Sequence, residues 1–353
     1  MGLCIPHPGH FEALEEIIKS SGKEIYEIYM NGCPDYIGSV RRILESSPTM
    51  EDIAEQTKFV HEHGIKMNVL SNSSCLGGQH LTDQGNKTYR WYLEKLNDIG
   101  VDSITVADPY LVEMISRDFD IEVVVSCISF VDSPEKAVYY EQLGAETITL
   151  DSNINKHFDL LEGIRDATSC NLRIMVNEGC LYRCPFRYAH FNLTSHYFGP
   201  GPRLNTIGDY YHDKCVSMRI ENPELIMRSG WIRPEDMKEY EKIGIDLFKI
   251  AGRVQPVNWI INCTQAYVNR SYDGNLMDIL DGTGALRHLF YIPNKELDGA
   301  IEKWKKCDKF CHKCSFCKEL VDKAVKIYSR KGTERENLKS FCSLKSVVSN
   351  ELV

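Results

Sequence analysis

The chain has 353 residues, of which 43% are hydrophobic and 26% charged, and its formal net charge is −9. This is the composition of a globular protein with one large or two smaller domains, which excludes disorder, collagen and coiled coil. No apolar run approaches the roughly 20 residues of a membrane helix, and the first residues turn acidic too early for a signal peptide. We therefore expect a cytoplasmic protein whose fourteen cysteines stay reduced.

Short β-rich runs alternate with helical patterns along the first 270 residues. Eight strands are predicted, at Glu24–Met30, Ile65–Leu70, Ser103–Val106, Ile121–Val125, Glu146–Leu150, Leu172–Val176, Leu225–Arg228 and Asp246–Ile250. Helices are predicted around them, at Phe11–Ser20, Met50–His63, Lys87–Ile99, Leu111–Arg117, Pro134–Leu143, Lys156–Arg165 and Pro234–Ile243. Glycines that precede several of the strands, Gly64, Gly100, Gly144 and Gly244, are typical of helix C-caps.

Helical crossovers imply parallel strand pairing, and eight parallel strands close a barrel. The pattern therefore predicts an α/β fold, a TIM-type (β/α)8 barrel over residues 1–270. A doubly wound open sheet is the alternative, but the chain has no glycine-rich phosphate loop to favour it. Residues 271–353 are predicted to form a loop followed by a Cys-rich helical extension, with a helix at Lys318–Lys331 packed on the barrel through an apolar stripe.

Cysteines follow several predicted strands, where TIM-type barrels carry their active sites. Cys33 comes after the first predicted strand, Cys180 and Cys184 follow Leu172–Val176, and Cys215 lies further along. Closely spaced thiols in a reduced compartment indicate metal ligands or a redox dithiol, although free cysteines are often buried packing residues. We expect Cys180, Cys184 and Cys215 to bind a metal centre, with Cys33 as the candidate fourth ligand.

A second group of thiols has the spacing Cys307-x3-Cys311-x2-Cys314-x2-Cys317. Four cysteines within eleven residues are a strong indication of a metal site. A second iron–sulfur cluster of the ferredoxin kind and a structural zinc ion both remain open.

Polar residues near the predicted strand ends are candidates for binding a substrate. Arg187, Lys249 and Arg253 could hold a carboxylate or phosphate. Asp108, Asn177 and Glu178 complete the candidate substrate-binding set, and His190 is either a catalytic residue or a helix cap. The sequence has no Walker loop, GxSxG elbow or HExxH motif, so it gives no support for a serine or zinc protease.

The charge distribution bears on the class of substrate. From residue 301 onward 13 Lys and Arg stand against 7 Asp and Glu, whereas the first 300 residues carry a balance of −15. Phosphate attraction needs clustered cations, so the acidic body favours a small molecule or peptide over RNA. The basic tail keeps RNA open as an alternative, and a solvated helix face explains that tail equally well.

The sequence resembles peptidase family U32, the collagenase-like peptidases, over roughly residues 5–270. The resemblance rests on Asp108-Pro109, Ser126, the Cys180–Cys184 loop, and above all GIDLFKIAGR at Gly244–Arg253 with Tyr267 in the helix that follows. It implies a TIM-type barrel. It further implies similarity to iron–sulfur members of the family that hydroxylate ubiquinone precursors or RNA bases without dioxygen.

By that resemblance, Cys33, Cys184 and Cys215 match ligands of a 4Fe–4S cluster, and Cys180 resembles a cysteine of other branches. An anionic co-substrate such as prephenate and a paired family member as partner are also implied. The chain departs from the family where Leu150-Asp151-Ser152 replaces a glutamate-containing segment, where Tyr182-Arg183 replaces serine-glycine, and in its extra C-terminal cysteines. A peptidase and a non-catalytic subunit of a paired complex remain alternatives.

Overall fold

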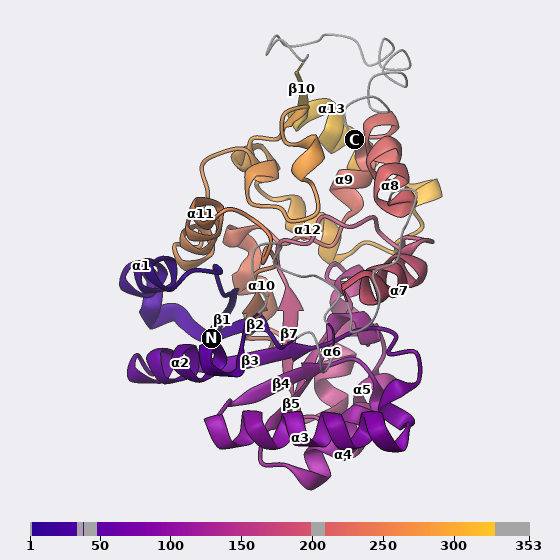
Figure 1. Cartoon of the computed structure of the whole chain (residues 1–353). Helices are drawn as coiled ribbons and strands as arrows, with labels where there is room; N and C mark the ends of the chain where they lie inside the picture. Colours follow the sequence, from indigo (N-terminus) through magenta and orange to yellow (C-terminus); the bar gives the residue numbers. More distant parts are fainter. Residues whose placement is uncertain (1, 34–37, 39–47, 199–208, 329–353) are drawn as a thin grey trace.

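Eight parallel strands close into a barrel in the computed structural model, which describes residues 2–33, 38, 48–198 and 209–328 (Figure 1). Each strand pairs with the next along the chain, and β1 closes the ring by pairing with β8, Gly2 opposite Leu247. The strands are β1 Gly2–Pro6, β2 Ile25–Asn31, β3 Lys66–Ser71, β4 Ser103–Val106, β5 Glu122–Val125, β6 Thr147–Thr149, β7 Asn171–Met175 and β8 Leu247–Lys249. The predicted TIM-type barrel is confirmed.

The membership of the barrel differs from the prediction in one strand. The prediction that Leu225–Arg228 is a strand was wrong, because Glu224–Arg228 forms the short helix α9, and the missing strand is β1 at the start of the chain. Both segments are short apolar runs, and such runs do not distinguish a buried strand from a turn of buried helix. The predicted number of eight strands was nevertheless correct, because one predicted strand is a helix and one actual strand, β1, was not predicted.

Helices surround the barrel and end where local sequence signals place their ends. Thr49 caps α2 through a reciprocal capping box with Asp52, and Ser133 caps α5 just before Pro134. Gly64, Gly100, Gly144 and Gly244 all have positive φ, as the expected C-cap role requires. The helices are α1 Phe11–Ser21, α2 Met50–Glu62, α3 Asp83–Ile99, α4 Pro109–Asp118, α5 Pro134–Gln142, α6 Phe158–Ala167, α7 Arg187–Phe198, α8 Tyr210–Glu221, α9, α10 Met237–Glu241 and α11 Val257–Val268.

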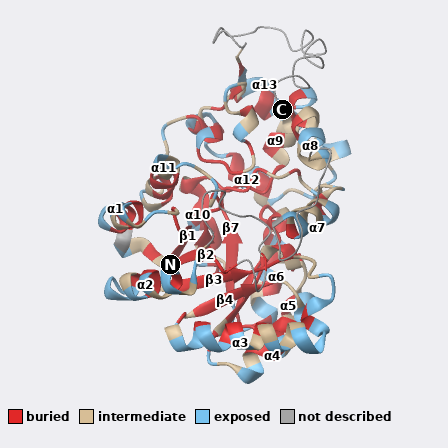
Figure 2. Ribbon diagram, viewed as in Figure 1, coloured by how far each residue is buried: buried red, intermediate tan, exposed pale blue. Residues whose placement is uncertain are grey.

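The C-terminal extension forms a layer beyond the end of β7. It contains β9 Phe290–Tyr291, α12 Ala300–Lys305, α13 Phe316–Ala324 and β10 Lys326–Ile327, and α13 packs against α9 (Figure 1). The backbone after β7 joins this layer, because Glu178 forms a parallel bridge with Asp281. The buried residues run from the barrel into this layer without a break (Figure 2).

The predicted helix at Lys318–Lys331 is shorter than expected. α13 ends at Ala324, after which Lys326 and Ile327 pair antiparallel with Tyr291 and Phe290. β-branched Val325 and Ile327 favour this extended backbone, and residues 329–331 lie outside the described residues. Among the described segments, no helix combines the length and the apolar character that crossing a bilayer requires.

Candidate functional site

A polar network fills the interior of the barrel. Arg173 of β7 pairs with Glu27 of β2 at 2.8 Å, and both side chains are only 1% exposed. Ser103 donates a hydrogen bond to the same Glu27 carboxylate. A buried charge is tolerated when it is paired and hydrogen-bonded, so this ion pair links β2 and β7 through the barrel interior.

Arg187 is the central charge at the C-terminal mouth of the barrel. Its guanidinium lies 3.2 Å from Asp151, which follows β6, and 3.4 Å from Glu178, which follows β7. All three side chains are buried. Burial raises the pKa of the Asp151 carboxyl, and Arg187 opposes that shift. The mouth therefore holds one cation between two carboxylates, one of which is prone to keep a proton.

Lys249, at the end of β8, supplies a second buried cation. Its ammonium lies 4.0 Å from the centre of the Tyr29 ring. Burial, reinforced by the nearby Arg173 charge, lowers the pKa of Lys249 to about 8. Arg253 follows in the next loop and donates a hydrogen bond to Asn31 at the end of β2. Lys249 thus lies at a strand end, whereas Arg187 begins α7 and Arg253 lies in the loop after β8.

Three other candidate residues have structural contacts that account for them. Asp108 caps α4 by accepting from the amides of Tyr110 and Leu111. Asn177 clamps the chain after β8, donating to the Ala251 carbonyl at 2.9 Å and accepting from its amide at 2.7 Å. His190 lies 3.1 Å from Asp209, the cap of α8, and is one-third exposed. These contacts position the loops. His190 lies inside α7 and contacts the residue that caps α8, so it is not itself a helix cap.

The loop after β7 brings two of the predicted thiols into each other's electrostatic range. Burial raises the pKa of the Cys184 thiol, and Cys215 on α8 adds to that shift. Buried Arg219 donates to the Cys215 sulfur at 2.7 Å and to the Gly179 carbonyl at 2.9 Å. Arg219 therefore ties Cys215 to the loop that carries Cys180 and Cys184.

Cys33 sits in a different environment. It belongs to the hydrophobic core, and its thiol donates to the Pro48 carbonyl at 3.2 Å and contacts the Met50 sulfur at 3.5 Å. Within the described residues, no three His, Cys, Asp or Glu side chains form a group that could hold a metal ion. The set of Cys33, Cys180, Cys184 and Cys215 is thus not assembled as a coordination sphere, and its role as a ligand set stays a prediction.

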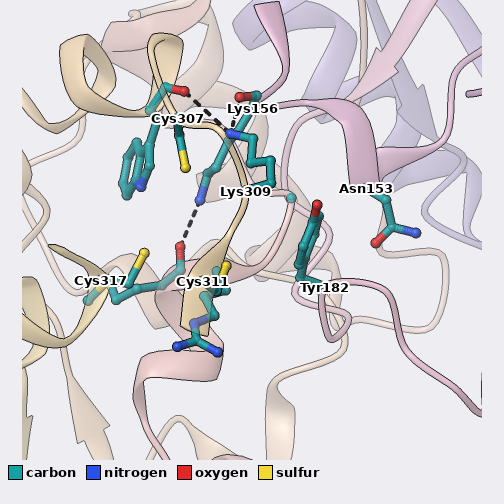
Figure 3. A pocket seen from close by; sticks show the side chains of 11 residues that line it. Asn153, Lys156, Tyr182, Cys307, Lys309, Cys311 and Cys317 are labelled. Atoms are coloured by element: carbon teal, nitrogen blue, oxygen red, sulfur yellow. Dashed lines mark hydrogen bonds between the residues drawn. The ribbon is translucent and has the colours of Figure 1, made fainter. Parts of the chain in front are cut away.

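A pocket at the junction of the barrel and the extension gathers the other thiols. Cys307, Cys311 and Cys317 line it, together with Lys156, Lys309 and Tyr182 (Figure 3). Tyr182 belongs to the loop after β7 and hydrogen-bonds His157 at 3.0 Å. Cys314 lies exposed on the turn between Cys311 and Cys317. Three of the four C-terminal cysteines therefore share one pocket, which also touches the loop of Cys180 and Cys184.

Sequence reasoning missed the two lysines of this pocket. Lys156 is buried, donates to the carbonyls of Met227 and Ser229, and lies 4.0 Å from the ring centres of both Trp231 and Trp304. Burial lowers the pKa of Lys156 to about 7. Lys309 donates to the carbonyls of Lys156 and Trp304. Its place within the C-terminal cysteine cluster was a visible signal, whereas nothing in the local sequence marks Lys156.

Comparison with known proteins agrees with this architecture. The family model described as Peptidase family U32 matches residues 10–183. A relative from Methanocaldococcus jannaschii, named "Uncharacterized protease MJ1657", is 45% identical over 333 residues, covering 92% of this chain and 98% of its own. The solved structure of the U32 peptidase Mk0906 is 25% identical, with a TM-score of 0.55, and the match covers 71% of this chain and 93% of that one. The chain belongs to peptidase family U32.

Proposed function

We propose that this chain is an iron–sulfur enzyme that hydroxylates a small anionic molecule or peptide without dioxygen, or performs a related redox oxygen transfer, at the barrel mouth. The observation that carries the proposal is the Arg219 bridge, which joins Cys215 to the loop of Cys180 and Cys184 beside the charged mouth. Hydrogen bonds to the ligand sulfurs help to set the reduction potential of an iron–sulfur cluster, and the Arg219 guanidinium would supply one.

The donor set fits a cluster only in part. Cys184 and Cys215 interact, but a complete set of thiols is not gathered among the described residues. A bound 4Fe–4S cluster would supply a redox-active or Lewis-acidic iron. Because the set is incomplete, we derive no reaction step through a cluster.

The chain's own residues at the mouth suit an anion. Arg187, Lys249 and Arg253 would bind its carboxylate or phosphate groups, and the carboxyl of Asp151, whose pKa is raised by burial, would hold a proton beside them. A dicarboxylate co-substrate such as prephenate matches this combination of cations.

Anaerobic purification of the full chain tests the proposal. We expect iron, acid-labile sulfide and the visible absorbance of thiolate-to-iron charge transfer. Cys184→Ala and Cys215→Ala should each reduce the iron content, since both remove a proposed ligand. Cys170→Ala is the matched control, because that thiol donates to the Ala145 carbonyl at the opposite end of β7. Equal iron content in all four proteins, or no iron in any, would refute the assignment.

The names of the two relatives favour a second candidate, a peptidase. A hydrolytic serine or cysteine needs an adjacent base. Several histidines lie in segments that follow barrel strands. Of these, His7, His80, His157 and His190 contact Gln56, Asp108, Tyr182 and Asp209 respectively. Ser126 and Cys127 directly follow β5 and are the candidate nucleophiles of such a peptidase. Cleavage of casein or gelatin that survives chelation and is abolished by Cys127→Ala or Ser126→Ala would establish this alternative.

A further inference from the structure

The thiol pocket, defined here by Cys307, Cys311, Cys317, Lys156 and Lys309, contains cations without acidic partners. No carboxylate of the described residues lies within ion-pair distance of Lys156 or Lys309, whose ammonium groups bond to backbone carbonyls. Asp236, which acts on Lys156 from further away, is already paired with Arg233 at 3.0 Å. The third cation at the pocket, Arg228, is paired with Glu224 at 2.9 Å.

Buried ammonium groups are costly unless negative charge lies nearby. Free thiols are neutral and do not supply it. Bound to a metal, however, cysteine is a thiolate, and four thiolates around Zn²⁺ or around an oxidised 4Fe–4S core leave two negative charges in excess. Buried Lys156 and half-buried Lys309, which have no carboxylate partner among the described residues and lie beside the cysteines, are the counter-charges that such a centre needs.

We propose that Cys307, Cys311, Cys314 and Cys317 bind a metal–tetrathiolate centre, separate from the barrel mouth, whose excess negative charge is neutralised by Lys156 and Lys309. Binding releases the four thiol protons to solvent and leaves the metal's oxidation state unchanged. Among the described residues these thiols are not gathered as a ligand group, so binding would draw the three pocket thiols together, and Cys314 would close the site from its exposed turn.

The position of the pocket gives the centre a structural consequence. The four cysteines belong to the extension, Lys156 follows β6 of the barrel, and Tyr182 belongs to the loop after β7 (Figure 3). Metal binding would therefore join the extension to the loop that carries Cys180 and Cys184. Metal–thiolate sites contribute folding free energy in this way.

The metal content of purified protein tests the site. Zinc, iron and sulfide are measured on the wild type, on Cys311→Ala and Cys317→Ala, and on the Cys170→Ala control. Loss of one zinc, or of one complete cluster, in the pocket variants alone supports the centre and identifies the metal. Unchanged metal content in both variants overturns it. The proposed function fails separately, if Cys184→Ala and Cys215→Ala retain all their iron.

A second experiment does not depend on cysteine variants that fold. The metal is removed with a chelator, Co²⁺ is titrated into reduced protein, and the thiolate-to-cobalt absorbance is followed. We expect the Lys156→Met, Lys309→Met double variant to bind Co²⁺ at least tenfold more weakly than wild type, because the thiolate charge is no longer neutralised. Equal affinity in the two proteins would contradict the counter-charge role.

Rates of cysteine alkylation distinguish protection by a bound metal ion from a general stabilisation of the fold. Cys307, Cys311, Cys314 and Cys317 should react with iodoacetamide more slowly in Co²⁺-loaded wild type than in metal-free wild type, as measured by peptide mass spectrometry. Cys75, which is half-buried at a distant strand end, should react equally in both. Protection of Cys75 to the same degree would show mere tightening of the fold and would overturn the site.

Discussion

The barrel mouth and the thiol pocket both bury cations, but they neutralise them differently. Arg187 at the mouth lies between the carboxylates of Asp151 and Glu178, whereas Lys156 and Lys309 in the pocket contact carbonyls and aromatic rings. The polypeptide itself thus neutralises the charge of Arg187. The pocket is short of negative charge, which indicates that an additional group completes it.

Removing the central cation of each region should give the largest difference in stability between the two regions. Arg187→Met leaves two buried carboxylates without their cation, so we expect the free energy of unfolding to fall by about 3 kcal/mol. Lys156→Met removes an ammonium that has no acidic partner. The variant loses two hydrogen bonds but no longer buries a charge, and the two effects oppose each other. The free energy of unfolding of the metal-free protein should therefore fall by about 1 kcal/mol or less. Urea unfolding at pH 7 in chelator measures both. Equal losses would contradict the proposed difference between the regions.

A substitution at Gly179 tests the contact between the loop after β7 and the C-terminal extension. A Cβ at this position would lie 2.4 Å from the Thr283 methyl carbon and 2.9 Å from the Asp281 carbonyl. Gly179→Ala should therefore cost about 1–3 kcal/mol of stability, because the loop after β7 must separate from the extension. Gly284→Ala is the matched control, since its Cβ meets nothing within 4 Å. A neutral Gly179→Ala in thermal or urea unfolding would mean that the two layers are loosely joined.

The pH dependence of stability should report the buried lysine of the mouth when wild type is compared with a variant that lacks it. Burial lowers the pKa of Lys249 to about 8 from the ordinary lysine value of 10.5. Between these values the unfolded chain holds the proton and the folded chain does not, so stability rises as pH increases from 8 toward 10.5. Relative to Lys249→Met, wild type should gain roughly 1–2 kcal/mol between pH 7 and pH 10. Parallel curves for the two proteins in urea titrations would show that Lys249 is not held in this environment.

The periodicity of the sequence was sufficient to predict the barrel. Seven of the eight strands and the glycine C-caps follow from local patterns. The error at Leu225–Arg228 arose because its three apolar residues fit either a strand or a helical turn, and packing against α13 stabilises the helix.

The candidate site was predictable only where chemistry lies next to a strand end. Arg187, Glu178 and Lys249 follow from that rule, and the cysteine spacing alone marked the C-terminal cluster. The counter-charge at Lys156 was not predictable, because it depends on residues about 150 positions apart packing around Trp231 and Trp304. The roles of Asn177 and Asp108 as backbone clamps also required the fold, since their sequence neighbours do not reveal which amides they contact.

The most direct test of the account is the metal bound per chain in anaerobically purified protein, compared between the Cys311→Ala, Cys317→Ala double variant and the Cys184→Ala, Cys215→Ala double variant. The account predicts that each pair removes its own centre and leaves the other filled. Simultaneous loss of all metal from either pair, with the fold intact by circular dichroism, would contradict two separate centres.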